Sequence, residues 1–518
     1  MPNACRYFGC FVLSVYSVFF LPSSLFGQSE QGKGLRLERT GTEQVYFSYN
    51  GKPLLSFGAL CDFIFYLRES EHDFRLWADW ASDHGMNHIR AYPPLCWTLL
   101  QDQIRQNGGK ADNIDLPYAE VSSGSRQFDL TRFNENWWKD FRTKCEYLRS
   151  KGIILHLLMW SSFHVRPNQW KGSLFNPDNN ISSFTNHLKA KPFKIHSLLD
   201  EHEELTEVQR DWFRKLIEQT YDLDNVYYDL VHEIEPRYDN WEDTKLWIQD
   251  MASAVRQKWY QLDAKRPLIL GMDAGKMDGM GYPRDQHAGM PPEGSAIDWM
   301  FTRPYFDVLI YGRSHFVENA IRWRRKYKKP YIGQECFDDN GQTYTYRRPT
   351  DRVHIRKYVW KFMMAKCQQM DIYMKGGSAR PGGPPGFNLN YDPRGWSPFE
   401  KDAVILRRFW ESLIDCPNLW FTGAIETGPG NHQYVLSSPR EAVIYCSSAT
   451  GIEGQRFEKQ TVRARGLAIR PGDCIVEIIK PDAGLLESRR IELSGSSVEI
   501  ELPEFVDDIA VHLIKQSN

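Results

Sequence analysis

Two glutamates, about a hundred residues apart, each end an apolar segment of the chain. Glu233 ends the segment NVYYDLVHE, and Glu335 ends the segment KPYIGQE. Both segments are rich in β-branched and aromatic residues, a pattern that predicts buried parallel strands. A carboxylate is costly to bury, and barrel enzymes place their catalytic groups where strands end. Two carboxylates on different strands of one barrel are the minimum equipment for cleaving a glycosidic bond.

The elements that must position these glutamates alternate regularly between strand-like and helix-like patterns. The predicted strands span residues 53–60, 86–93, 153–160, 225–233, 267–275, 306–312, 330–335 and 370–377. The predicted helices span residues 72–85, 133–152, 206–221, 240–262, 315–327, 352–369 and 397–414. Eight strand–helix units in one run predict an α/β fold, a (β/α)8 TIM barrel over residues 36–414.

The pattern changes after Cys416, where helical periodicity ends. Short strand-like runs, such as EAVIYCSS, CIVEIIKP and IAVHLIKQ, are separated by Gly, Pro and Ser clusters. This predicts a second, smaller all-β sandwich domain over residues 417–518.

The first residues of the chain have the pattern of a targeting signal. Arg6 supplies a positive charge, and the apolar run over residues 8–21 is too short to span a bilayer. Small residues follow, so we expect a signal peptide over residues 1–27 with cleavage near Gly27. The chain is then exported (secreted, periplasmic or cell-surface), without stable membrane insertion once the signal is removed. An uncleaved membrane anchor is the alternative.

Composition narrows the classes of partner. The net charge of −2 predicts no attraction to nucleic acid or to anionic membranes. Aromatic residues make up 14% of the chain, including 17 Trp and 25 Tyr, which suits a protein that stacks sugars but also suits core packing. Neither CxxC nor HExxH occurs, so we expect no metal and no other cofactor. The cysteines are widely spaced, and we expect buried free thiols.

Three segments of the chain resemble the retaining β/α-barrel glycosidases of the cellulase-like clan, of the glycoside hydrolase family 5 type. DNVYYDLVHE resembles the fourth-strand motif that ends in the acid/base glutamate, and KKPYIGQE resembles the seventh-strand motif that ends in the nucleophile. MNHIRAYP resembles the second-strand motif, whose arginine lies below the nucleophile. The resemblance implies that Glu233 is the acid/base, Glu335 the nucleophile and Arg90 its neighbour. It also implies an appended β-sandwich.

The sequence departs from the clan's pattern beside Glu233. The clan usually has Asn before this glutamate and Pro after it, whereas this chain has His232 and Ile234. The clan's Asn typically binds the sugar 2-hydroxyl, and a histidine can hydrogen-bond there with a different reach and its own titration. The clan often has Trp at the end of strand eight, where this chain offers Tyr373 and Lys375.

Several candidate residues have two interpretations. Glu235 points the same way as Glu233 on an extended strand, so it stays a competitor for the acid/base role. Arg90 either orients Glu335 or forms a structural salt bridge with another strand-end acid. His156, within strand three, is interpreted as a core histidine.

Three further residues are candidate contacts of the substrate. Tyr311 and His315 flank the end of strand six, where the clan often has a polar aromatic contact to the nucleophile or the sugar. For His315 the alternative is a surface position at a helix start. Trp160 ends strand three and is either a sugar platform or a packing residue.

These observations predict a retaining glycoside hydrolase that acts on β-linked oligosaccharides or polysaccharides with two carboxyl groups about 5–5.5 Å apart. The first alternative is a non-catalytic glycan-binding protein on the same barrel. The second is a hydrolase of esters or amides, which is disfavoured because the chain has no GxSxG motif.

Overall fold

The computed structural model describes residues 33–40, 44–60, 64–65, 74–83, 85–98, 115–197, 202–234, 241–273, 290–311, 317–333, 351–372, 397–449 and 451–516. The predicted signal peptide over residues 1–27 lies outside these ranges, as do Glu335, Glu235, His315, Tyr373 and Lys375.

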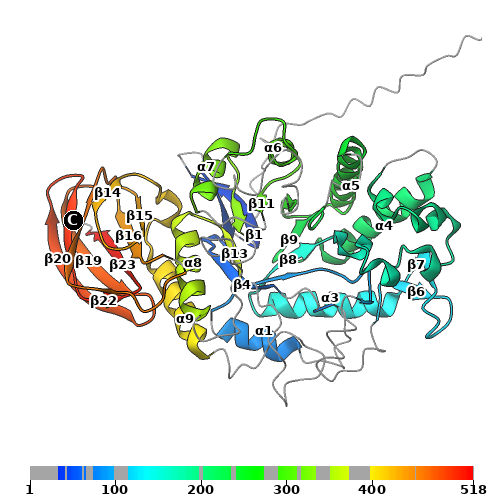
Figure 1. The fold of residues 1–518 in the computed structure, drawn as a ribbon, viewed down its shortest axis with the longest axis horizontal. Coiled ribbons are helices and arrows are strands. Elements are labelled where there is room, and N and C mark those ends of the chain that lie inside the picture. Colours follow the sequence, from blue (N-terminus) through cyan, green and yellow to red (C-terminus); the bar gives the residue numbers. More distant parts are fainter. Residues whose placement is uncertain are drawn as a thin grey trace, which may run out of the picture.

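The centre of the molecule is an eight-stranded parallel sheet in the order β10-β9-β8-β5-β4-β13-β12-β11 (Figure 1). Its strands are β4 (Ser56–Leu60), β5 (His88–Ala91), β8 (Ile154–Leu158), β9 (Val226–Asp229), β10 (Leu270–Gly271), β11 (Leu309–Tyr311), β12 (Tyr331–Gly333) and β13 (Gln369–Ile372). Seven of these strands lie within segments predicted to be strands, and β13 begins one residue before its predicted segment, at Gln369. A parallel bridge joins Asp273 to Ile310, so the two edges of the sheet meet.

Helices between the strands cover the outer face of this sheet (Figure 1). They are α1 (Phe74–Asp83), α3 (Glu135–Ser150), α4 (Glu203–Thr220), α5 (Trp241–Gln261), α6 (Ala296–Thr302), α7 (Val317–Tyr327), α8 (Asp351–Met364) and α9 (Ser397–Ser412). Helix α3 shows why they form. Its N-cap Asn134 accepts a hydrogen bond from Trp137 N, and Trp138, Phe141, Cys145 and Leu148 form one buried stripe at helical spacing.

An N-terminal antiparallel sheet, which the sequence patterns did not predict, closes one end of the parallel sheet. It comprises β1 (Leu35–Arg39), β2 (Val45–Tyr49) and β3 (Lys52–Pro53). Leu35 N donates to Asp224 O just before β9, and Phe47 N donates to Gln368 Oε1 just before β13. The small sheet therefore covers the N-terminal ends of the strands, and Leu35 and Phe47 share an apolar cluster with interior residues such as Ile154.

The segment between β5 and α4 contains short elements that the sequence patterns also missed. They are the hairpin β6 (Tyr118–Glu120) and β7 (Phe128–Phe133), and the 3-10 helices η3 (Ser162–Val165), η4 (Trp170–Gly172), η5 (Pro177–Asn179), η6 (Ser183–Lys189) and η7 (Pro192–His196). Elements of three to seven residues are too short to show a hydrophobic period.

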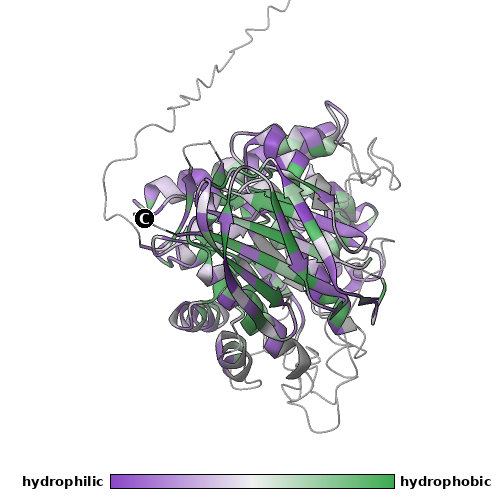
Figure 2. Ribbon diagram, turned by 90° about the vertical axis from the view of Figure 1, so that its left-hand side faces the viewer, coloured by the Kyte–Doolittle hydropathy of each residue, from purple (hydrophilic) through white to green (hydrophobic). Residues whose placement is uncertain are grey.

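The C-terminal β unit consists of antiparallel strands. One sheet joins β14 (Ala424–Thr427), β18 (Gln460–Arg465) and β21 (Val498–Leu502). The second joins β15 (His432–Ser437), β16 (Glu441–Ser447), β23 (Asp508–Lys515), β19 (Gly472–Lys480) and β20 (Gly484–Leu493), and β17 (Arg456–Phe457) pairs with β22 (Phe505–Val506). Hydrophobic and hydrophilic residues vary along these strands (Figure 2). Both main sheets contribute to one apolar cluster, through Val462 and Ile500 from the first and Val476 and Val511 from the second.

Helix α8 joins the C-terminal β unit to the α/β part of the chain. Arg356 Nη2 lies 2.6 Å from Asp508 Oδ1, and both side chains are buried. Trp360 stacks on Tyr445 with ring centroids 5.5 Å apart. A charged pair and an aromatic stack at one contact fix the two units against each other.

Two further expectations concern cysteines and membranes. The described cysteines are free and buried, as expected: Cys96, Cys145, Cys367, Cys416, Cys446 and Cys474. In the part of the chain that the structure describes, no helix combines the length and the apolar character needed to cross a bilayer.

Candidate active site

Glu233 lies just beyond the C-terminal end of β9, at the end of the sheet opposite the N-terminal antiparallel sheet. Its neighbour His232 joins the ends of two strands, because His232 N donates to Trp160 O at 2.7 Å and Ser162 N donates to His232 O at 3.1 Å. The backbone then turns into the left-handed region, with φ of 49° at Glu233. This conformation is uncommon for a residue with a side chain and is concentrated at functional sites. Glu233 is 7% exposed.

Arg166 holds the Glu233 carboxyl group. Its Nη2 donates to Glu233 Oε2 at 2.6 Å. The guanidinium carbon lies 4.0 Å from the ring centroid of Phe163, in the same 3-10 turn, which is a cation–π contact. An arginine at this distance stabilises the carboxylate form of its partner. The ion pair therefore fixes the position of the Glu233 carboxyl group.

His232 is oriented by a second carboxylate. His232 Nδ1 lies 2.9 Å from Asp273 Oδ2, and both side chains are buried. The imidazole also packs edge-to-face on Phe163, with centroids 5.1 Å apart. A carboxylate accepts hydrogen bonds, so Nδ1 donates to Asp273 and the ring orientation of His232 is fixed.

A buried polar layer lies below this pair, inside the parallel sheet. Asp273 N donates to Asp229 Oδ1 at 3.0 Å, and Asp229 Oδ2 lies 3.6 Å from His156 Nε2. Arg90 is paired with His156 in the register of β5 and β8. His156 stacks on Tyr227 at 4.5 Å between centroids. The layer thus runs from β5 through β8 and β9 to the end of β10.

Burial decides the protonation of this layer. Desolvation, and then the charge of Asp273, raise the pKa of Asp229 well above its usual value, although Arg90 opposes the shift. Desolvation, and then repulsion from His88 and Arg90, lower the pKa of His156 well below its usual value. Both pKa shifts favour the uncharged forms of these groups.

The structure places the other predicted site residues as follows. Arg90 is 1% exposed and acts on Asp229, whereas its expected partner Glu335 lies outside the described residues. Tyr311 is buried at the end of β11, paired with Gly333 in the register of β11 and β12, and contacts Trp323. Glu235 and His315 also lie outside the described residues.

Trp160 is fully buried, and its indole N–H donates to His196 Nε2 at 3.1 Å. It also packs on Phe175, Phe213 and Trp247. A ring enclosed in this way presents no face to a sugar. Of the two roles considered for Trp160, the contacts support packing.

Sequence reasoning missed Arg166, Asp273 and Asp229. Asp273 ends the predicted strand five just as Glu233 ends strand four, and the same argument about costly carboxylates applies to it. Asp229 lies within the segment NVYYDLVHE and interrupts its apolar run. Arg166 follows a short 3-10 helix in an irregular segment, and no spacing pattern marks it. Among the described residues, no group of three or more His, Cys, Asp and Glu side chains could hold a metal ion.

Comparison with known proteins identifies the fold through structure. No family model matches the sequence, and no curated protein matches it. A solved structure described as a glycoside hydrolase aligns with a TM-score of 0.57 at 11% identity, covering 94% of this chain and 98% of that chain. A glycoside hydrolase family 5 structure from Bacteroides vulgatus ATCC 8482 aligns with a TM-score of 0.56 at 11% identity, covering 93% of this chain and 94% of that chain. The chain therefore has the cellulase-type fold of glycoside hydrolase family 5, as the motif resemblance implied.

Proposed function

We propose that this protein is an exported retaining glycoside hydrolase that cleaves β-linked glycans on a (β/α)8 barrel. The observation that carries the proposal is the position of Glu233. It is a nearly buried carboxyl just beyond the fourth strand of a glycoside-hydrolase fold, with Arg166 and the His232–Asp273 pair around it. The end of a barrel formed by the C-termini of its strands is where such folds carry catalysis.

Glu335 is the proposed nucleophile. It follows β12 by two residues, and Glu233 follows β9 by four. Because neighbouring strands of this sheet pair in parallel, the C-terminal ends of β9 and β12 lie at the same end of the sheet, which supports a site shared by the residues that follow them. A retaining mechanism requires their carboxyl groups about 5–5.5 Å apart.

In the first step, Glu335 attacks the anomeric carbon, the glycosidic C–O bond breaks, and Glu233 gives its proton to the leaving oxygen. In the second step, Glu233 removes a proton from water, the water oxygen bonds to the anomeric carbon, and the bond to Glu335 breaks. Arg166 favours the base form for the second step, so the first step requires this ion pair to weaken when substrate binds. No metal or organic cofactor takes part.

His232 is the proposed substitute for the clan's asparagine beside the acid/base. The Nδ1 of His232 is occupied by Asp273, so Nε2 accepts a hydrogen bond from a sugar hydroxyl. An asparagine amide could either donate a hydrogen bond to that hydroxyl or accept one from it. We further propose that residues 1–27 are the signal peptide, and that the catalytic domain and the β-sandwich span residues 36–414 and 417–518.

A non-catalytic glycan-binding protein is the second candidate. One observation favours it: the Arg166–Glu233 ion pair holds the proposed acid in its charged form. Turnover of any glycoside that depends on Glu233 would exclude this candidate.

The test begins with a screen of purified protein against aryl β-glycosides and β-linked polysaccharides. For the best aryl substrate, Glu335→Ala should abolish turnover. Glu233→Ala should slow the second step, and azide should restore the rate, because azide attacks the glycosyl–enzyme without needing a base. Glu146→Ala, on the exposed face of α3, is the matched control and should behave as wild type. Unchanged turnover in both site variants would overturn the proposal.

A further inference from the structure

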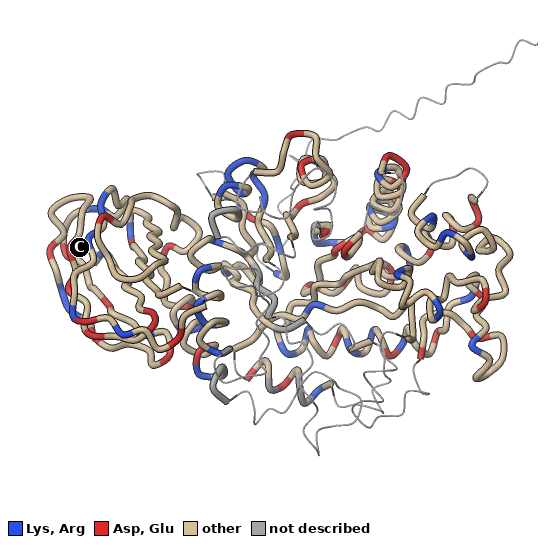
Figure 3. The backbone as a smooth tube through the Cα atoms, viewed as in Figure 1, with Lys and Arg blue, Asp and Glu red and all other residues tan. Residues whose placement is uncertain are grey.

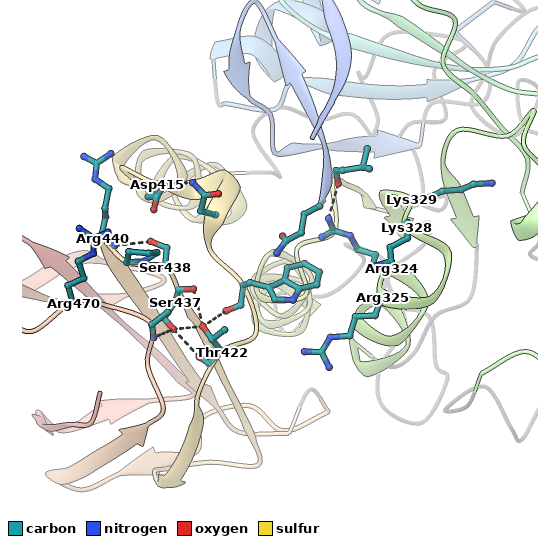
Figure 4. A pocket seen from close by; sticks show the side chains of 16 residues that line it. Arg324, Arg325, Lys328, Lys329, Asp415, Thr422, Ser437, Ser438, Arg440 and Arg470 are labelled. Atoms are coloured by element: carbon teal, nitrogen blue, oxygen red, sulfur yellow. Dashed lines mark hydrogen bonds between the residues drawn. The ribbon is translucent and has the colours of Figure 1, made fainter. Parts of the chain in front are cut away.

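A pocket of about 690 Å³ lies between the α/β part of the chain and the C-terminal β unit (Figure 4). Helix α7 and the turn after it form one wall, and the C-terminal β unit forms the other. Its volume falls in the range of about 300–1,000 Å³ that is typical of small-ligand sites. Its charged described lining residues are Arg324, Arg325, Lys328, Lys329, Asp415, Arg440 and Arg470.

Two of the six cations have structural roles. Arg324 is buried and donates to the carbonyl oxygens of Val45 and Lys366, and burial lowers its pKa to about 10. Lys329 Nζ donates to the carbonyl oxygens of Phe301 and Arg303 at 2.8 and 2.7 Å. These two residues build the wall of the pocket and are not counted as ligand contacts.

The other four cations, Arg325, Lys328, Arg440 and Arg470, are exposed. None of them forms an ion pair with any carboxylate that the structure describes. Positions occupied by Lys and Arg are frequent along α7 (Figure 3). The described lining has one carboxylate, Asp415, against these four exposed cations, so the local potential is positive and attracts anions.

Several other basic residues of the protein surface do have carboxylate partners. Arginines outside the pocket have carboxylate partners at 2.6–2.9 Å: Arg463 with Glu499, Arg465 with Glu426, and Arg489 with Glu487. On α7 itself, Lys326 pairs with Asp298 at 2.7 Å. These four cations have carboxylate partners, whereas the four exposed cations that line the pocket have none among the described residues.

An aromatic ring and hydroxyl groups complete the lining. The half-buried Trp420 contacts Arg324, whose guanidinium carbon lies 5.2 Å from the ring centroid. Thr422 and Ser437 lie deeper and hydrogen-bond to each other at 2.6 Å (Figure 4). An aromatic face suits the apolar face of a sugar ring, and arginine forks suit carboxylate or sulfate oxygens.

The pocket lies away from Glu233. Val45 belongs to the sheet that covers the N-terminal ends of the strands, and Lys328 precedes β12, whereas Glu233 follows the C-terminal end of β9. We propose that this pocket binds an anionic oligosaccharide, through carboxylate or sulfate groups on its sugars, while the active site stays open. The inference is independent of the proposed glycosidase activity.

The experiment measures binding by isothermal titration calorimetry with the full chain. The probes are a hexauronate, a sulfated hexasaccharide, a neutral hexasaccharide, inorganic sulfate and a single-stranded DNA dodecamer. The pocket variants are Arg325→Gln/Lys328→Gln from one wall and Arg440→Gln/Arg470→Gln from the other. The control variant Arg463→Gln/Arg489→Gln removes one exposed and one half-buried arginine, both of which have carboxylate partners.

We expect the wild type to bind at least one anionic hexasaccharide, and each pocket variant to weaken that binding about tenfold. The control variant should bind within twofold of wild type, and the neutral hexasaccharide should bind much more weakly. Three results would overturn the inference: no binding of either anionic hexasaccharide, equal binding by wild type and pocket variants, or sulfate or DNA binding as tightly as the sugars. Circular dichroism of each variant separates a folding defect from a binding defect, and no result depends on turnover.

Discussion

Substitution of Arg166 by glutamine should shift the alkaline limb of the pH–activity profile. The limb reports the loss of the acid's proton, and Glu233 is the proposed acid. Arg166 Nη2 lies 2.6 Å from Glu233 Oε2, so the wild-type enzyme should lose this proton at a lower pH than it would without the arginine. Glutamine keeps a hydrogen-bond donor and removes the charge.

The magnitude follows from the geometry of the pair. Two unit charges with centres about 4 Å apart interact by about 4 kcal/mol at an effective dielectric constant of about 20. The Arg166 side chain is 23% exposed and that of Glu233 is 9% exposed, so solvent screens part of this energy. A discount of about half leaves roughly 2 kcal/mol, or about 1 to 2 pH units.

The assay is the pH dependence of kcat/KM on the best aryl β-glycoside. We expect the alkaline limb of Arg166→Gln to lie about 1 to 2 pH units above that of wild type. The acid limb, which reports ionisation of the nucleophile, should stay in place. Arg142→Gln is the matched control, because Arg142 pairs with Asp222 at 2.5 Å on the helical surface. An unmoved alkaline limb, or one at lower pH, would refute the assignment of Glu233 as the acid held by Arg166.

Three further predictions test other contacts. Asp273→Asn removes the charged partner of His232, so kcat/KM should fall about tenfold or more, and chemical denaturation should show a loss of about 2 kcal/mol. Burial lowers the pKa of His164 from 6.5 to about 3. Between these two pH values the imidazole binds a proton in the unfolded chain but not in the folded chain, so the free energy of unfolding decreases as the pH falls from 6.5 toward 3. In urea titrations between pH 6 and 4.5, His164→Asn should make the decrease in the free energy of unfolding smaller by about 1.4 kcal/mol per pH unit. The same pH dependence in His164→Asn and wild type would contradict the lowered pKa of His164. Arg356→Met leaves Asp508 buried without its partner and should cost about 3–5 kcal/mol, seen by calorimetry as earlier unfolding of the C-terminal β unit, whereas an unchanged profile would show that the pair does not couple the units.

The strands of the central sheet could be predicted because each is a short β-branched or aromatic run between helices of clear amphipathic period. Helix α3 is an example, since its buried stripe repeats every three to four residues. The N-terminal antiparallel sheet was missed, although it closes the sheet through Leu35 and Phe47. Its strands have the same short alternating pattern as many loops. Their place below the parallel sheet becomes visible only from the hydrogen bonds to Asp224 and Gln368.

The candidate site could be predicted in part. Glu233 stands out because a charge at the end of an apolar strand needs a reason. Arg166 could not be found in this way, because arginines are commonest in solvated loops and its position in the sequence is therefore ordinary. Only the fold brings Arg166 to Glu233. For Trp160 the sequence left two roles open. A strand-end tryptophan has the chemistry of a sugar platform, but five buried aromatic neighbours decide its role, among them His164 and His196.

The most direct test of the central claim is covalent trapping. A 2-deoxy-2-fluoro glycoside with a good leaving group forms the glycosyl–enzyme and slows its hydrolysis, because the fluorine destabilises the oxocarbenium-like transition state of the second step. Peptide mass mapping then locates the sugar, with the sugar chosen from the substrate screen. Our account predicts one label per chain, on the peptide that contains Glu335, and no label in the Glu335→Ala protein. A glycoside turned over without a label, or a label on any other residue, would contradict it.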